Sequence, residues 1–113
     1  MTILYGIPNC DTVKKARAWL AEHEVAYTFH DYKKAGVDED ELRRWVDTLG
    51  WEKLLNRQGM TFRKLPDEDK TDVDTDKAIR LMLAHPSAIR RPVIVSGDAI
   101  IVGFDPARYL DLR

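Results

Sequence analysis

The spacing of apolar residues near the N-terminus predicts a strand, a loop and a helix in succession. Residues 2–5 form a short apolar run typical of a strand, and residues 6–9 carry the glycine and proline expected of a loop. Apolar side chains then recur at helical spacing up to about residue 22, on a face made of Val13, Ala16, Trp19 and Leu20. The loop therefore leads directly into a helix.

Residues 26–32 change to a period of two, which predicts a second strand. Tyr27, Phe29 and Asp31 fall on one side of it. A strand, a helix and a second strand in this order favour a right-handed crossover in which the two strands run parallel.

The middle of the chain is predicted to be helical. A helical pattern follows Asp38 and ends at Gly50, a short helical turn follows at residues 51–56, and a further helix is expected at about residues 75–84. The acidic residues 67–76 are interpreted as a solvated loop. Their aspartates imitate the start of a calcium-binding loop, but Lys77 stands where that loop needs glycine.

The end of the chain predicts a hairpin followed by a short helix. Two apolar runs flank Ser96-Gly97-Asp98, and Asp105-Pro106 is a helix start. The elements together predict an α/β fold of thioredoxin-like plan, in which β-α-β and β-β-α units form a mixed sheet. We expect a single domain over residues 1–113, with an inserted helical subdomain at about residues 36–88.

Composition narrows the class of protein. The 113 residues are 44% hydrophobic and 33% charged, and a net charge of -1 gives no basic field to attract nucleic acid or an anionic membrane. The apolar runs are far shorter than a membrane span, and the first residues lack the pattern of a signal peptide. One cysteine allows no internal disulfide, which fits a reducing compartment, so we expect a cytoplasmic monomer with no direct nucleic-acid or membrane partner.

The single cysteine, Cys10, is the strongest candidate for chemistry. A lone cysteine is commonly inert and buried. Here it lies just before a predicted helix, where backbone N–H groups carry partial positive charge and stabilise a thiolate. Asp11 would oppose this effect, but we expect its side chain to point to solvent. Asn9 and Thr12 are further candidate hydrogen-bond donors to the sulfur.

Other cysteine and metal chemistries fit the sequence poorly. A Cys-X-X-Cys dithiol is excluded because Val13 occupies the second cysteine position, and a phosphatase-type Cys-x5-Arg loop is excluded because Ala16 stands where the arginine belongs. Zinc needs about four ligands, whereas the histidines, at positions 23, 30 and 85, are scattered over different elements. We therefore expect no metal site.

Two arginines are candidate partners of the thiolate. Arg91 precedes Pro92 at the entry to the third predicted strand, which in a thioredoxin-like fold faces the helix start that bears the cysteine. The bond before such a proline is frequently cis. A cation at this position would stabilise the thiolate and bind an oxyanion or a carboxylate. Arg57 lies beside Gly59 in an apparent loop.

Three separated motifs resemble the ArsC arsenate reductase family: GIPNCDT at residues 6–12, KLLNR at residues 53–57 and HPSAIRRPVIV at residues 85–95. Together they span most of the chain in order, and its short length is similar to the YffB/Spx-like branch. The resemblance implies a thioredoxin-like fold with a helical insertion, Cys10 as nucleophile and Arg91 as the arginine before the strand-entry proline. The family's insert arginine corresponds to Arg57, or to the position of Asn56 in an ungapped register.

The resemblance implies thiol redox chemistry. We expect a glutathione-dependent thiol oxidoreductase that works through mixed disulfides of Cys10, with glutathione as co-substrate. Arg91 and Arg57 would hold glutathione carboxylates or an oxyanion, and backbone groups beside Pro92 would pair with the tripeptide.

Two alternatives remain open. One is glutaredoxin-coupled arsenate reduction, although the arginine that such reductases carry after the last strand is absent from residues 102–106. The other is a non-enzymatic regulator that resembles Spx and binds RNA polymerase.

Overall fold

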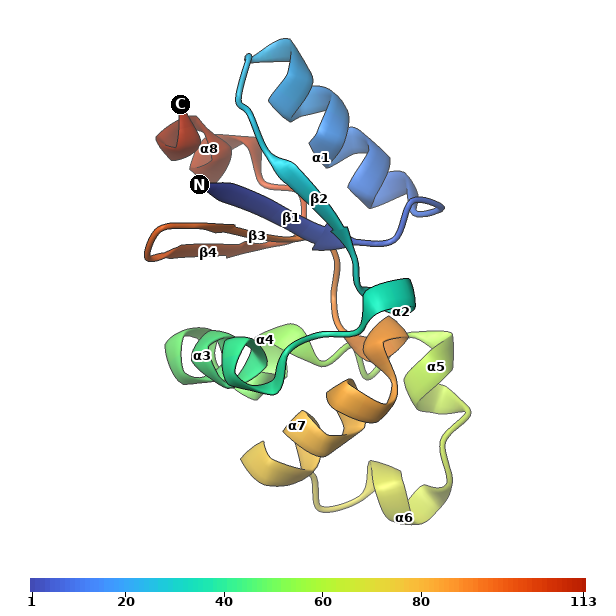
Figure 1. Cartoon of the computed structure of the whole chain (residues 1–113). Coiled ribbons are helices and arrows are strands. Elements are labelled where there is room, and N and C mark those ends of the chain that lie inside the picture. The colour runs from blue at the N-terminus through green and yellow to red at the C-terminus, as the bar shows by residue number, and fades with distance from the viewer. The chain divides into compact units, whose positions relative to one another are not determined.

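The computed structural model describes residues 1–113, and its internal contacts divide the chain into two compact units. The first unit consists of Met1–Ala35 and Arg91–Arg113, and the second of Gly36–Arg90. Figure 1 shows the helices and strands of both units.

The first unit contains a four-stranded mixed sheet with the order β2-β1-β3-β4. Its elements are β1 (Thr2–Gly6), α1 (Asp11–Glu22), β2 (Thr28–Asp31), α2 (Tyr32–Ala35), β3 (Val93–Ser96), β4 (Ala99–Val102), α8 (Pro106–Tyr109) and a 3-10 helix (Leu110–Leu112). β1 runs parallel to β2 and antiparallel to β3, and β3 pairs antiparallel with β4. The predicted thioredoxin-like plan is therefore confirmed for this unit.

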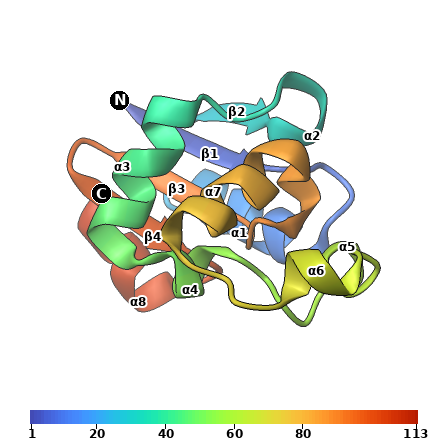
Figure 2. The same cartoon turned by 90° about the horizontal axis from the view of Figure 1, so that it is seen from below.

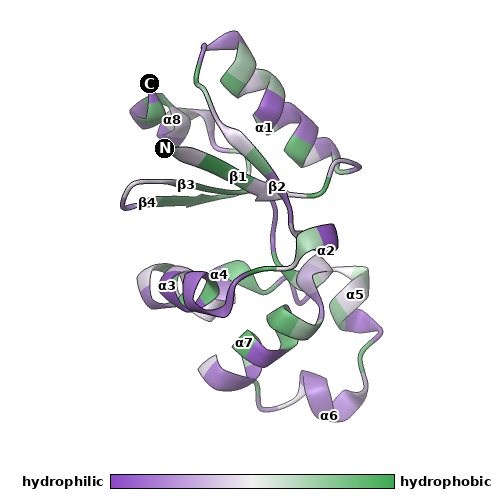
Figure 3. Cartoon of the chain, in the orientation of Figure 1, coloured by the Kyte–Doolittle hydropathy of each residue, from purple (hydrophilic) through white to green (hydrophobic).

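One face of this sheet is covered by α1 and α8. The residues of the sheet and of both helices that share this core are Leu4, Val13, Ala16, Leu20, Ile94, Ile101 and Tyr109. Figure 3 shows the apolar character of β1, β3 and β4 and the mixed polarity of α1. Packing against this core fixes where α1 begins relative to the end of β1, and that junction carries the cysteine.

The second strand is shorter than predicted. It ends at Asp31, and Tyr32 opens the helix α2 instead of extending the strand. The reason is local, because the Asp31 carboxylate accepts hydrogen bonds from the backbone N–H groups of Lys33 (3.1 Å) and Lys34 (3.3 Å). A side chain that satisfies the first N–H groups of a helix stabilises a helix start at that point.

The second unit is helical. It contains α3 (Glu39–Leu49), α4 (Trp51–Leu54), α5 (Met60–Arg63), α6 (Asp67–Lys70), α7 (Thr75–Ala84) and a 3-10 helix (Pro86–Ala88). The Asp38 side chain caps α3 by accepting from the Glu41 N–H (3.1 Å), and the Asp74 side chain caps α7 by accepting from the Lys77 N–H (2.9 Å). Figure 2 shows α3 and α7 side by side. None of the chain's helices has the length and apolarity needed to cross a membrane.

The prediction of a solvated loop at residues 67–76 was wrong for its first half, which forms α6. Lys77 explains part of this order, since its ammonium donates to the carbonyl oxygens of Glu68 and Thr71. The side chain that makes a calcium loop unsuitable thus supplies a positive charge that satisfies carbonyl groups of the segment.

Candidate active site

Cys10 occupies the N-cap position of α1. Its backbone is extended (φ -125°, ψ 124°), and its carbonyl oxygen accepts the Lys14 N–H at 2.9 Å, which begins the helix. The thiol is half-buried, whereas the neighbouring Asn9 and Asp11 are exposed. Asp11 therefore lies in the first turn but faces solvent, as expected from the sequence.

The surroundings of the thiol favour its charged form. Burial alone raises its pKa, but the backbone N–H of Val13, the Arg91 guanidinium and the backbone N–H of Thr12 outweigh that effect, so the pKa of the Cys10 thiol is lowered. The sulfur does not form the short cap that a serine or aspartate oxygen makes at this position. Its contacts with the N–H groups are those of a larger, softer atom at the positive end of a helix.

Arg91 enters the site through a cis peptide bond with Pro92. The Pro92 carbonyl oxygen accepts the N–H of Gly103 at 2.8 Å, which ties the segment to the end of β4. The Arg91 guanidinium donates hydrogen bonds to the Tyr32 hydroxyl and to the Cys10 sulfur. Partial burial lowers the pKa of Arg91, but the effect of these two partners is larger and the pKa is raised overall. The guanidinium therefore stays charged.

Tyr32 belongs to the site and was not predicted to do so. Its side chain is buried, and burial raises the pKa of its hydroxyl to about 12 despite the nearby Arg91 charge. The hydroxyl is therefore a neutral partner that orients the guanidinium without competing for its charge. The available signal was the rule that a buried tyrosine needs a partner for its hydroxyl, but that rule requires knowledge of which tyrosine is buried.

Of the predicted site residues, the structure brings Arg91 and Thr12 to the Cys10 thiol. Thr12 contributes its backbone N–H to the thiol, and Arg91 and Pro92 belong to the same unit as Cys10. Asn9 lines a neighbouring pocket. No group of three or more His, Cys, Asp or Glu side chains is arranged to hold a metal ion.

Arg57, the other predicted cation, lies in the second unit. Its guanidinium carbon is 5.2 Å from the centre of the Trp51 ring, a cation–π distance. The Asn56 side chain accepts the N–H of Gln58 at 3.2 Å and so shapes the turn that presents Arg57. The role of Arg57 in ligand binding stays a prediction.

The strand order and pairing give the first unit a thioredoxin-like fold, with the cysteine at the start of its first helix. The model of the ArsC family matches residues 5–112, so the chain belongs to the ArsC family. This match confirms the resemblance found in the three sequence motifs.

Similar proteins include YffB, a protein related to arsenate reductase and a transcriptional regulator. A solved structure of the YffB protein is 55% identical, with a TM-score of 0.95 over 99% of this chain and 98% of that one. An arsenate reductase (ArsC) related protein from Brucella melitensis is 53% identical, with a TM-score of 0.76 over 97% of this chain and 92% of that one. The global transcriptional regulator Spx of Streptococcus mutans is 31% identical over 107 residues, 93% of this chain and 77% of Spx.

Proposed function

We propose that the protein is a glutathione-dependent thiol oxidoreductase whose redox centre is Cys10. The observation that carries the proposal is the position of the thiol between two backbone N–H groups of α1 and the Arg91 guanidinium, which together lower its pKa. The thiolate is the species that attacks a disulfide, so this setting increases the nucleophilic fraction at neutral pH.

The reaction has two balanced steps. In the first, the Cys10 thiolate attacks the glutathione sulfur of a mixed disulfide on the substrate; the old S–S bond breaks, the substrate leaves as a thiolate that takes a proton from water, and Cys10 becomes glutathionylated. In the second, a glutathione thiolate attacks this new disulfide, which releases oxidised glutathione and restores the Cys10 thiolate. The chain has one cysteine, so the second thiol must come from outside.

Arg91 has a role in both steps. In the resting protein its guanidinium compensates the thiolate, and when Cys10 becomes a disulfide that negative charge is lost. A carboxylate of the attached glutathione then replaces it as the partner of Arg91. Pro92 has no N–H to donate, so backbone N–H groups that pair with the peptide would come from the residues beside it.

The test is turnover of a glutathionylated peptide with reduced glutathione, followed by mass spectrometry. We expect wild type to form a single adduct of one glutathione on Cys10 and to release free peptide. Cys10→Ser should abolish both. A wild-type protein that neither gains the adduct nor accelerates peptide release contradicts the proposal. Arsenate turnover coupled to glutaredoxin, dependent on Cys10, would instead identify arsenate as the substrate.

A regulatory role is the second candidate, because the similarity to Spx extends over 93% of this chain. This hypothesis predicts that the purified protein binds RNA polymerase and that Cys10→Ser binds equally well. Binding that is lost in Cys10→Ser, or absent from wild type, would count against a cysteine-independent regulator.

A further inference from the structure

A pocket of about 520 Å³ opens beside the loop that carries the cysteine. It is lined by Ile7, Pro8, Asn9, Asp31, Lys33 and Lys34. The volume falls within the range of about 300–1,000 Å³ typical of small-ligand sites. Asn9 immediately precedes Cys10 in the chain, so the loop that carries the cysteine forms one wall of the pocket.

The topology of the sheet explains why these residues meet. Gly6 and Asp31 are partners in the parallel pair of β1 and β2, so both strands end at the same edge. The loop to Cys10 leaves the end of β1, and the lysines follow the end of β2. The carboxyl ends of neighbouring parallel strands commonly form ligand sites, because the two outgoing segments enclose a crevice.

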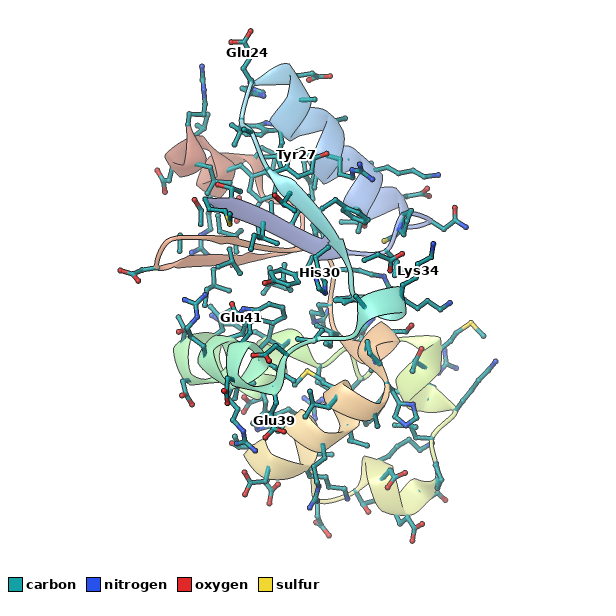
Figure 4. The ribbon with its side chains drawn as sticks, in the orientation of Figure 1. Glu24, Tyr27, His30, Lys34, Glu39 and Glu41 are labelled. Carbon is teal, nitrogen blue, oxygen red and sulfur yellow. The ribbon has the colours of Figure 1, made fainter.

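The pocket carries an excess of positive charge. Neither lysine ammonium takes part in an ion pair, and the Asp31 carboxylate accepts the backbone N–H groups of both lysines instead. Lys33 and Lys34 are exposed, and Figure 4 shows Lys34 extending from α2. The two ammonium groups outnumber the single carboxylate, which already accepts two hydrogen bonds. This balance of charge favours an anionic ligand.

We propose that this pocket binds a carboxylate of the glutathione that is joined to Cys10, with Lys33 and Lys34 as its cationic partners. The inference rests on the proposed function and extends it. Glutathione has carboxylates at both ends, so Arg91 at the sulfur and the two lysines in the pocket engage separate groups. Tethering through the disulfide keeps the second carboxylate near the pocket, which makes even weak exposed ion pairs effective.

The test compares two disulfides and three proteins. Second-order rate constants for adduct formation on Cys10 are measured with oxidised glutathione and with the neutral bis(2-hydroxyethyl) disulfide. The proteins are wild type, Lys33→Gln/Lys34→Gln, and Lys14→Gln/Lys15→Gln. The last variant removes the same charge from the exposed surface of α1, near the thiol but outside the pocket.

We expect Lys33→Gln/Lys34→Gln to lower the rate with oxidised glutathione about three- to tenfold, the effect of two exposed carboxylate–lysine pairs. The rate with the neutral disulfide should stay within about twofold, as should both rates in Lys14→Gln/Lys15→Gln. Higher salt should narrow the difference, because it screens exposed charges.

Equal losses with both disulfides, equal losses in the two lysine variants, or no loss would overturn the carboxylate site. In each of these cases a fast wild-type reaction leaves the proposed function standing. A wild-type protein that reacts with neither disulfide faster than a free thiol at the same pH refutes both proposals together.

Discussion

Gly6 and Val13 approach each other so closely that a Cβ atom at Gly6 would lie 2.9 Å from a γ-methyl carbon of Val13. The end of β1 is thereby in direct contact with the first turn of α1. Val13 also supplies the backbone N–H that does most to lower the pKa of the Cys10 thiol. The absence of a side chain at Gly6 thus lets the helix start close enough to the strand to place that N–H at the sulfur.

Gly6→Ala should displace the first turn of α1. We expect a loss of about 1–3 kcal/mol in the free energy of unfolding, typical of overpacking, and a higher pKa for Cys10. Urea denaturation and the pH dependence of iodoacetamide alkylation measure the two effects. Val13→Ala in the same chain removes the methyl groups and should restore much of the low pKa. If Gly6→Ala alkylates with the wild-type pH profile, the close approach is not what positions the N–H.

Arg91→Gln should raise the pKa of Cys10 toward the ordinary value of about 8.5, because the thiolate loses a hydrogen bond and a compensating charge. Alkylation should slow at pH 7 and match wild type at about pH 10, where the thiol is ionised in both proteins. Arg90→Gln, at the adjacent exposed position, is the matched control and should leave the profile unchanged. An equal shift in both variants would assign the effect to overall charge.

The lowered pKa of Cys10 also predicts how stability varies with pH. Between the lowered pKa and the unfolded value of about 8.5, the unfolded chain keeps the thiol proton that the native protein has lost. Stability therefore rises with pH across this window. The stabilising contribution of the thiolate is complete above the unfolded pKa and disappears as pH falls through the native pKa. Urea denaturation of reduced wild type should show this rise relative to Cys10→Ser. Parallel curves for the two proteins would contradict it.

The raised pKa of Tyr32 predicts that stability falls as pH rises in alkaline solution. Its pKa is raised to about 12, whereas an unfolded tyrosine ionises near 10. The unfolded chain therefore releases this proton first, and stability is lost as pH rises between these values. Tyr32→Phe should flatten the decline measured by denaturation between about pH 9.5 and 11. Burial raises the pKa of Tyr109 too, so Tyr109→Phe should flatten the remaining slope.

Lys77→Met should loosen residues 67–74 without unfolding α7. The substitution removes the ammonium that binds the Glu68 and Thr71 carbonyls, but the backbone N–H of Lys77 still receives the Asp74 cap. We expect faster cleavage after Glu68 by a glutamate-specific protease at unchanged global stability. Lys53→Met, at another exposed lysine of the second unit, should cleave at the wild-type rate.

The longer helices and the strands were predictable because their apolar residues recur at a regular spacing over several helical turns or along paired strands. The helix at Thr75–Ala84 has the predicted bounds, and the hairpin around Gly97 forms as expected. The helices α2, α5 and α6 have four residues each, too few for a helical period to appear in the sequence. The start of α2 depends on the two hydrogen bonds that the Asp31 side chain accepts, which periodicity does not reveal.

The same distinction applies to the site. Cys10 was recognisable because a helix start has a known electrostatic character, and Arg91 because it precedes a proline at a strand entry. Tyr32 was assigned to the second strand, where its hydroxyl had no evident target. Lys33 and Lys34 belong to no motif in the sequence, and the pairing of β1 with β2 brings them to the pocket that Asn9 also lines.

The hydrogen bond between Tyr32 and Arg91 joins the two places where the chain passes from one unit to the other. Tyr32 lies four residues before Gly36, and Arg91 directly follows Arg90, the last residue of the second unit. The hydrogen bond therefore closes the chain between these two residues, 33–90, into a loop. The length of a closed loop affects its closure entropy only logarithmically. Insertions or deletions in the intervening segment thus change the closure entropy little, provided that the hydrogen bond between Tyr32 and Arg91 is kept.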